Sequence, residues 1–297
     1  MDYSFPHYLL SKQSVDDRAL NRHVYDRLVE SLPGGPLRII EVGAGIGSML
    51  TRLLRWGLFE RAEYVLVDEM AENIEYAVGW LPVWAAENDM QVAWLTSNKL
   101  RLYDARRDVL VSLVRADVFD FIRSQPQTAD LLIAHAFLDL LNMPESLRGL
   151  FSLLKPDSLA WLTVNFDGVT TFQPVIDPGL DRQIEKLYHQ TMDTRSSGGD
   201  SQAGRHLFGH FSGLGAQILA AGASDWVVHA LDGKYQADEA YFLNFILYFF
   251  ELSLTGHPGL DGAAFGAWLA ERRSQVERAE LVYIAHQVDF LVKPPEA

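Results

Sequence analysis

Glu41-Val42-Gly43-Ala44-Gly45-Ile46-Gly47 is the stretch that decides the fold of this 297-residue chain. An apolar run from Leu37 precedes it, and a helical pattern of apolar residues begins near Met49. A buried strand, a glycine turn and a helix N-terminus in this order are typical of sites for nucleotide-like ligands. The spacing differs from that of the dinucleotide fingerprint, because Ser48 stands where the last glycine of that fingerprint belongs.

The composition is that of a globular protein with a full core. Apolar residues make up 48% of the chain and charged residues 22%. The chain has no cysteine, which excludes disulfides, thiolate metal sites and a cysteine nucleophile. Its 25 basic and 39 acidic residues give a net charge of −14, and such a surface repels phosphate backbones. We therefore expect no nucleic-acid partner.

Neither the apolar stretches nor the N-terminal residues of the sequence indicate a membrane protein. The longest apolar stretch, Tyr241 to Leu254, is interrupted by Asn244 and Glu251 and is too short to cross a bilayer. The first residues lack a basic segment followed by an apolar one, so the sequence suggests no export. The prediction is a cytoplasmic protein without a membrane partner.

Strand and helix patterns alternate through the first half of the chain. This order predicts an α/β fold, a doubly wound, mostly parallel seven-stranded sheet with helices on both faces. Helices are expected near residues 14–32, 47–56, 70–80 and 145–154, and strands near 37–42, 62–68, 109–115, 130–135, 159–165, 224–230 and 281–292.

Some segments do not fit the alternation. We interpret residues 1–297 as a single domain with a hairpin insertion at 84–108 and helical cap insertions at 166–203 and 237–280. Insertions after late strands lie at the carboxyl edge of a parallel sheet, where open α/β folds bind ligands. The segment 241–250 is unusually aromatic, which is compatible with core packing, a dimer contact or the wall of a pocket. A homodimer is therefore left open.

The pattern Glu-x-Gly-x-Gly-x-Gly at residues 41–47 resembles motif I of the class I S-adenosylmethionine (SAM) dependent methyltransferases. Acids at matching places, Asp68 after the second strand and Asp117 after the third, extend the resemblance over residues 37 to about 165. The resemblance implies SAM as cofactor, S-adenosylhomocysteine as product, and an N-terminal lid formed by residues 1–35. Ordinary alternatives remain, because the glycines can simply close a turn and both acids can cap helices.

The resemblance also implies roles for individual residues. Glu41 would accept a hydrogen bond from the cofactor's ammonium group, and Asp68 would accept both ribose hydroxyls. Asp117 would bind the adenine amino group, while the backbone N–H of Val118 would donate to the ring. The full set of predicted cofactor residues is Glu41, Gly43, Ala44, Gly45, Gly47, Asp68, Glu69, Met70, Asp117, Val118 and His135.

The methyl acceptor is inferred by elimination. The chain lacks the Asn/Asp-Pro-Pro-aromatic motif of enzymes that methylate nucleic-acid amino groups, and it lacks the paired-glutamate loop of arginine methyltransferases. A small molecule remains as substrate, and a general base is needed only if the acceptor atom carries a proton. His135, Asn165 and His210 are the candidate catalytic residues, and no metal site is predicted.

Two other functions stay open at this point. One is a nicotinamide-dependent oxidoreductase with a deviant glycine loop, against which Glu41 and Ser48 both count. The other is a protein that binds SAM without methylating.

Overall fold

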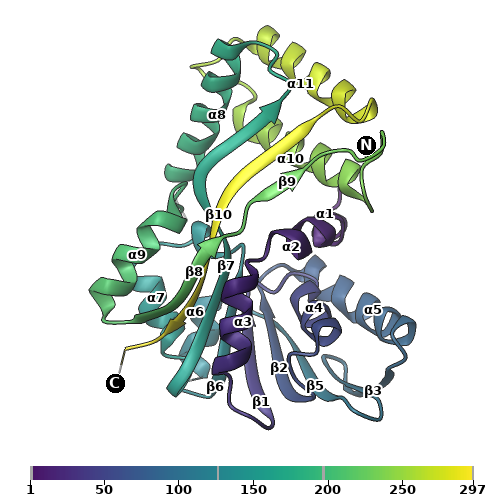
Figure 1. The fold of residues 1–297 in the computed structure, drawn as a ribbon, viewed down its shortest axis with the longest axis vertical. Helices are drawn as coiled ribbons and strands as arrows, with labels where there is room; N and C mark the ends of the chain where they lie inside the picture. Colours follow the sequence, from purple (N-terminus) through teal and green to yellow (C-terminus); the bar gives the residue numbers. More distant parts are fainter. Residues whose placement is uncertain (1–2, 126, 196–197, 296–297) are drawn as a thin grey trace.

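The computed structural model describes residues 3–125, 127–195 and 198–295, which form one mixed sheet with helices on both faces (Figure 1). Over these residues the sheet has ten strands, nine of them in the order β3-β4-β5-β2-β1-β6-β7-β10-β8, with β9 paired to β10. The strands are β1 (Leu37–Val42), β2 (Arg61–Asp68), β3 (Gln91–Thr96), β4 (Lys99–Tyr103), β5 (Asp108–Arg115), β6 (Ala129–His135), β7 (Leu154–Gln173), β8 (Gln217–Ala223), β9 (Trp226–Val228) and β10 (Val282–Lys293).

The helices cover both faces of the sheet, as the sequence predicts. They are α1 (Phe5–Ser11), α2 (Gln13–Ala19), α3 (Arg22–Ser31), α4 (Ser48–Trp56), α5 (Ala71–Glu87), α6 (Val118–Ser124), the 3₁₀ turn η1 (Leu138–Leu140), α7 (Glu145–Phe151), α8 (Pro178–Asp193), α9 (Ala203–Leu214), α10 (Glu239–Leu254) and α11 (Gly262–Glu277). Neighbouring residues of β1 divide between the two cores, Ile39 packing on one face and Ile40 on the other. In the part of the chain described, no helix is long and apolar enough to span a membrane.

The prediction of seven strands is wrong, because the sheet of the described residues has ten. β5, β2, β1, β6 and β7 are parallel, while β10 is antiparallel to both β7 and β8. The additional strands are the hairpin β3–β4, which extends the sheet at its edge, and β8. The strand predicted at 224–230 corresponds to β9, whereas the sequence does not predict β8, which precedes it. β8 is rich in Ala and Gly, and Ile218 is its one β-branched residue, so the pattern by which strands are recognised is weak here.

The predicted helix at 14–32 is instead two helices, α2 and α3, which join at Asn21. The Asn21 side chain caps α3 by accepting a hydrogen bond from the Val24 N–H (3.1 Å), and its amide donates to the Ala223 carbonyl (2.8 Å). Its backbone N–H donates to the buried carboxylate of Asp289 (2.8 Å). A tertiary contact therefore sets the break between the two helices.

Replacing Asn21 by alanine is expected to lower the free energy of unfolding by about 1–2 kcal/mol, because the cap and the bond to the sheet are both lost. Asn21→Ser, which keeps a capping oxygen, should lose less. Urea unfolding of the two variants measures the difference. Equal stabilities would contradict the role of the cap.

β7 and β10 are much longer than the other strands and leave the sheet together toward a cap formed by α8, α10 and α11 (Figure 1). Their antiparallel pairing runs from Ala160 opposite Val292 to Gln173 opposite Val282. The sequence predicts only residues 159–165 as strand here, because the polar far end of β7 has no apolar alternation of its own. The ribbon formed by the two strands positions the cap above the carboxyl ends of the parallel strands.

Candidate active site

A cavity of about 370 Å³ lies at the carboxyl ends of β1, β2, β5 and β6. The loop tips that follow these strands all line it, with Gly43 and Gly45 after β1, Asp68 at the end of β2 and Asp117 after β5. Phe5, Leu9 and Lys12 of the N-terminal segment close one side. Its volume lies within the range of ligand pockets, roughly 300–1,000 Å³. We call it the first cavity.

The glycine loop needs glycine for its backbone conformation. Gly43, Gly45 and Gly47 have φ values of 62°, 56° and 81°, in the left-handed region that other residues rarely adopt. A Cβ on Gly43 would lie 2.3 Å from the Phe137 ring, and one on Gly45 would lie 2.7 Å from the Leu9 side chain. The loop therefore allows side chains, and any ligand in the cavity, to approach its backbone closely.

Asp68 supports this loop from the end of β2. One carboxylate oxygen accepts from the Gly45 N–H (2.8 Å), and the other accepts from the Met70 N–H (2.9 Å) and the Asn73 amide (3.1 Å). A carboxylate has about four acceptor positions, so three protein donors leave room for one more. Asp68 thus shapes the loop and still faces the first cavity, which Glu69 and Met70 also line.

Asp117 is both a helix cap and a cavity residue. Oδ1 accepts from the backbone N–H groups of Phe119 (2.8 Å) and Asp120 (3.1 Å) at the start of α6. As the first residue of that helix, Val118 has a backbone N–H that the helix does not use. Asp117 and Val118 both line the first cavity.

Glu41 is a buried carboxyl at the end of β1 that lines the first cavity. The Tyr64 hydroxyl donates to its Oε2 (2.7 Å). Burial raises the pKa of Glu41 to about 8, although Tyr64 and the nearby Arg52 act in the opposite direction. A buried carboxyl with a raised pKa favours a cationic ligand, because the positive charge would stabilise its ionised form.

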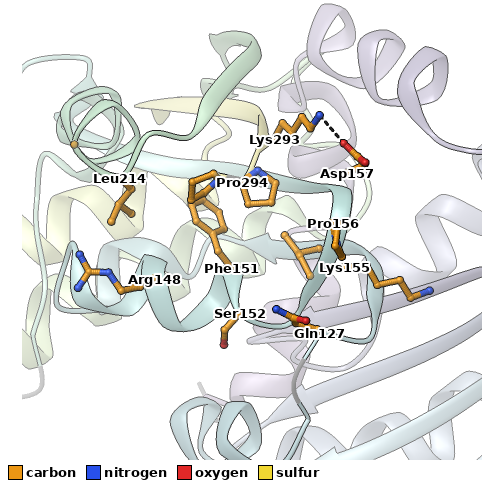
Figure 2. Close-up of a pocket in the computed structure, with 13 residues that line it drawn as sticks. Gln127, Arg148, Phe151, Ser152, Lys155, Pro156, Asp157, Leu214, Lys293 and Pro294 are labelled. Carbon is orange, nitrogen blue, oxygen red and sulfur yellow. Dashed lines mark ion pairs between the residues drawn. The ribbon is translucent and has the colours of Figure 1, made fainter. Parts of the chain in front are cut away.

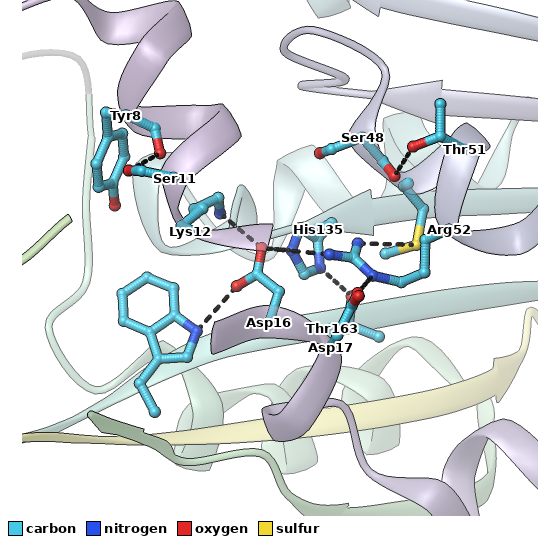
Figure 3. A network of polar contacts seen from close by, with 12 residues as sticks. Tyr8, Ser11, Lys12, Asp16, Asp17, Ser48, Thr51, Arg52, His135 and Thr163 are labelled. Atoms are coloured by element: carbon cyan, nitrogen blue, oxygen red, sulfur yellow. Dashed lines mark hydrogen bonds and ion pairs between the residues drawn. The ribbon is translucent and has the colours of Figure 1, made fainter. Parts of the chain in front are cut away.

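His135 lines the first cavity at the end of β6, where both of its ring nitrogens have partners (Figure 3). Nε2 lies 2.9 Å from Asp16 Oδ2, and Nδ1 lies 2.8 Å from the Thr163 hydroxyl. Burial lowers the pKa of His135 to about 4, with Asp16 opposing. The neutral ring therefore donates to Asp16 and accepts from Thr163. Both nitrogens are engaged within the protein, an arrangement suited to positioning the lid segment rather than moving a proton.

Asp16 is the centre of that network (Figure 3). It is fully buried in α2 and also accepts from the Trp226 indole N–H (2.9 Å). Lys12 lies 3.4 Å and Arg52 3.7 Å from its Oδ2. Burial acts to raise the pKa of Asp16, but Lys12, His135 and Arg52 together hold it below its usual range. The ionised carboxylate thus joins α2 to β6, α4 and β9.

The other two candidate catalytic residues lie away from the cavities. Asn165 is buried in β7, where its amide donates to the carbonyls of Leu162 (3.0 Å) and Val288 (2.8 Å). His210 lies on α9 and lines neither this cavity nor the next. The alternation of side chains along a strand explains why Asn165 lies outside the site. Its neighbours Val164 and Phe166 line the second cavity, so Asn165 faces the opposite side of β7. The structure therefore brings His135 to the site and leaves Asn165 and His210 outside it.

A second cavity of about 350 Å³ adjoins the first. The two share Phe5, Leu9, Lys12, Leu140 and Arg195 as a common boundary, together with Ala136. The remaining wall of the second cavity includes six aromatic side chains, those of Tyr8, Phe166, Tyr188, Trp226, Phe249 and Tyr283. These residues come from α1, β7, α8, β9, α10 and β10. The aromatic helix α10 contributes Phe249 and Ile246 here and is otherwise mostly buried core.

Sequence reasoning missed most polar residues of the second cavity. They are Asp139 in η1, Thr170 on β7, Gln287 on β10 and Arg195 after α8. The sequence does contain a signal for Asp139, because it is an acid in the loop after a parallel strand, β6, as Asp117 is after β5. Gln287 has no such signal, since only the pairing of β10 with β7 brings it to the site.

A further hollow of about 440 Å³ lies at the opposite edge of the sheet, where β6 and β7 begin (Figure 2). Its cations are largely paired, with Lys155 2.7 Å from Asp130 and Lys293 2.7 Å from Asp157. Open α/β folds bind ligands at the carboxyl ends of their strands, so this hollow is not the candidate site.

Comparison with known proteins supports the fold. A candidate methyltransferase of Bacillus halodurans has 8% sequence identity and a TM-score of 0.52, and the match covers 93% of this chain and 100% of that one. The chain has a methyltransferase-like fold. A SAM-dependent methyltransferase of Thiobacillus denitrificans, solved with S-adenosyl-L-homocysteine, has 12% identity, a TM-score of 0.49 and coverage of 99% and 100%. No protein-family model and no curated protein matches the sequence.

Proposed function

We propose that this protein transfers a methyl group from SAM to a small-molecule acceptor. The observation that carries the proposal is the convergence of three separate loop tips, at Gly43–Gly45, Asp68–Met70 and Asp117–Phe119, on one cavity that adjoins a second. The first cavity offers a place for the cofactor and the second a place for the acceptor. A cytoplasmic location and a homodimer remain predictions from the sequence alone.

The residues of the first cavity fit SAM chemically. Glu41, a buried carboxyl without a cationic partner within 4 Å among the described residues, suits the ammonium group. Asp68 retains acceptor capacity for a ribose hydroxyl, and Oδ2 of Asp117, to which no described residue donates, suits the adenine amino group. Lys12, on the boundary between the cavities, suits the cofactor's carboxylate.

The bound cofactor would supply a methyl group on a positively charged sulfur. The chain's own contribution is alignment and exclusion of water, since an in-line displacement requires the nucleophile, carbon and sulfur to lie in a row. Phe5, Leu9 and Leu140 on the boundary of the two cavities supply apolar surface around the reacting atoms. The contacts of Asp16 hold the N-terminal helices over them.

Two alternatives are less well supported. A nicotinamide oxidoreductase of the dinucleotide-binding type has a parallel sheet in the order 3-2-1-4-5-6, whereas β10 here lies antiparallel between β7 and β8. A protein that binds SAM without methylating would not need the second cavity. Calorimetry with S-adenosylhomocysteine and with NADH, followed by transfer of a labelled methyl group, tests all three. Absence of heat with S-adenosylhomocysteine would contradict the proposal.

Replacing Asp117 by serine is expected to weaken S-adenosylhomocysteine binding roughly tenfold while the free energy of unfolding changes by less than about 0.5 kcal/mol. Serine keeps the helix cap and removes the second carboxylate oxygen. Asp177→Ser is the matched control, because Asp177 caps α8 through the N–H groups of Gly179 and Leu180 and lines neither cavity. Unchanged affinity in both variants would leave Asp117 as a cap only.

A further inference from the structure

We propose that the methyl acceptor is an amine on a flat, apolar scaffold, and that Asp139 accepts the proton its nitrogen must lose. This inference rests on the proposed function and concerns the second cavity. It follows from the walls of that cavity, from the state of its carboxylate and from one buried amide.

The walls favour a flat ligand. Seven of the side chains that line the second cavity are aromatic. Their neighbours hold these rings in place, with Tyr188 stacked on Phe250 at 3.8 Å and Tyr8 stacked on Phe245 at 4.6 Å between ring centroids. Rigid aromatic surfaces bind flat apolar groups, and their π-electrons also attract a cation such as a substrate ammonium or a methylated product.

Asp139 is the acid of this cavity. Among the described residues, no Lys, Arg or His nitrogen lies within 4 Å of its carboxylate, although Arg195 and Lys12 line the same cavity. Lys12 is already paired with Asp16, and both cations lie on the boundary where the carboxylate of SAM would need them. A carboxylate without a counter-ion in an aromatic cavity favours an ammonium ligand.

The protonation of Asp139 suits this role. Burial raises its pKa to about 6, while Arg195 and Lys12 lower it and Asp200 raises it. The nearby Tyr8 and Tyr188 have pKa values raised by burial, so both remain neutral. At neutral pH Asp139 is therefore ionised and still basic enough to take a proton.

A buried amide provides a second point of recognition. Gln287 is 2% exposed and lines the second cavity, and its Oε1 has no hydrogen-bond partner within the described part of the chain. Buried polar atoms are nearly always paired in folded proteins, so this one indicates a partner on the ligand. A second N–H or O–H group of the acceptor would satisfy it.

The proton and charge balance of the step is complete. The ammonium form of the acceptor gives one N–H proton to the Asp139 carboxylate, which frees the nitrogen lone pair. That pair forms the new N–C bond as the C–S bond breaks, with its electrons remaining on sulfur. The products are a methylated ammonium ion, neutral S-adenosylhomocysteine and a protonated Asp139, which releases its proton to water.

The test uses the full chain saturated with S-adenosylhomocysteine. Matched one-ring and two-ring probes, 2-phenylethylamine, 2-phenylethanol and phenylacetate with their naphthyl counterparts, are titrated by calorimetry. At least one amine is expected to bind roughly tenfold or more tightly than its alcohol. Asp139→Asn should remove this preference, and Asp157→Asn, an exposed site at the far edge of the sheet, should retain it.

Each outcome has a separate meaning. If S-adenosylhomocysteine itself does not bind, the proposed function fails. If it binds and no amine exceeds its alcohol, or the carboxylates bind most tightly, the amine inference is overturned even should the Asn variant not fold. A preference that persists in Asp139→Asn overturns the role of Asp139. In transfer assays the rate on the best amine should fall below about pH 6, because Asp139 becomes protonated.

Discussion

Replacing Glu41 by glutamine is expected to make the protein more stable at pH 8 and to weaken its binding of S-adenosylhomocysteine by about 10- to 100-fold. Glutamine has the same shape and can still accept the hydrogen bond from Tyr64. It cannot carry the negative charge that a ligand ammonium group requires, and a charge-assisted hydrogen bond contributes about 1.5–3 kcal/mol.

The sign of the stability change follows from proton binding. The pKa of Glu41 is 4.5 in the unfolded chain and about 8 in the folded protein. Between these values the folded protein holds one proton more than the unfolded chain, so stability falls as pH rises. Across the whole interval the free energy of unfolding falls by roughly 5 kcal/mol. This loss of stability is complete above pH 8 and absent below pH 4.5. Glutamine does not titrate and removes this cost.

Urea unfolding of the wild-type protein and the Glu41→Gln variant at pH 5 and pH 8 measures the effect. The two should have similar stabilities at pH 5, and the variant should be more stable by several kcal/mol at pH 8. Glu60→Gln, at an exposed residue, is the control and should change neither. A less stable Glu41→Gln variant at pH 8 would mean that Glu41 is ionised in a structural pairing.

The ligand side of this prediction has its own pH signature. Arg52, Asp68 and Lys12 also act on Glu41, but burial dominates its pKa, so a bound ammonium must displace the proton. Affinity for S-adenosylhomocysteine should therefore rise from pH 6 to pH 8 in the wild type and stay flat in Glu41→Gln. 5′-Methylthioadenosine, which lacks the ammonium group, should bind both proteins equally at every pH.

Replacing Asp16 by alanine should lower the free energy of unfolding by about 3–5 kcal/mol, the usual result of removing one partner from a buried charge network. Lys12 and Arg52 would lose their shared carboxylate, and the donors of His135 and Trp226 would lose their acceptor. Residues of α1 and Lys12, which directly precedes α2, line the first cavity, so methyl transfer should fall with stability.

Thermal unfolding at pH 7 and binding of S-adenosylhomocysteine below the unfolding temperature separate the two effects. Asp16→Asn should lose less stability, since one amide oxygen can still accept from His135 or Trp226. The control is Asp238→Ala, which removes an exposed pair with His7 of α1 and should cost less than about 1 kcal/mol. An Asp16→Ala variant of wild-type stability would contradict an ionised carboxylate in the network.

The proposed cofactor half of the site follows a local pattern. Glu41, the glycines, Asp68 and Asp117 each end or follow a parallel strand, and parallel strands present their carboxyl ends on one edge. Spacing in the chain therefore predicts their meeting in space. The helix cap expected as the ordinary alternative is real at Asp117, which caps α6 and also lines the first cavity, while α5 after Asp68 has no side-chain cap.

The proposed acceptor half has no such pattern. Tyr8, Trp226 and Phe249 are more than two hundred residues apart at their extremes. Only the packing of α1 on α10, and of α10 on β7 and β10, brings them to one wall. His135 shows the same limit, since its partner Asp16 lies 119 residues earlier. Sequence identifies an imidazole at a strand end, but the contacts that hold it come from α2.

By itself, the sequence determined the alternation of strands and helices and the strand-end positions of Gly43, Asp68 and Asp117, because these depend on contacts within a few dozen residues. The tertiary structure decided the antiparallel ribbon of β7 and β10, the aromatic second cavity and the burial of Glu41. Burial is a property of the packed chain, and burial raises the pKa of Glu41 and that of Asp139. Local pattern thus places the acids, and packing sets their chemistry.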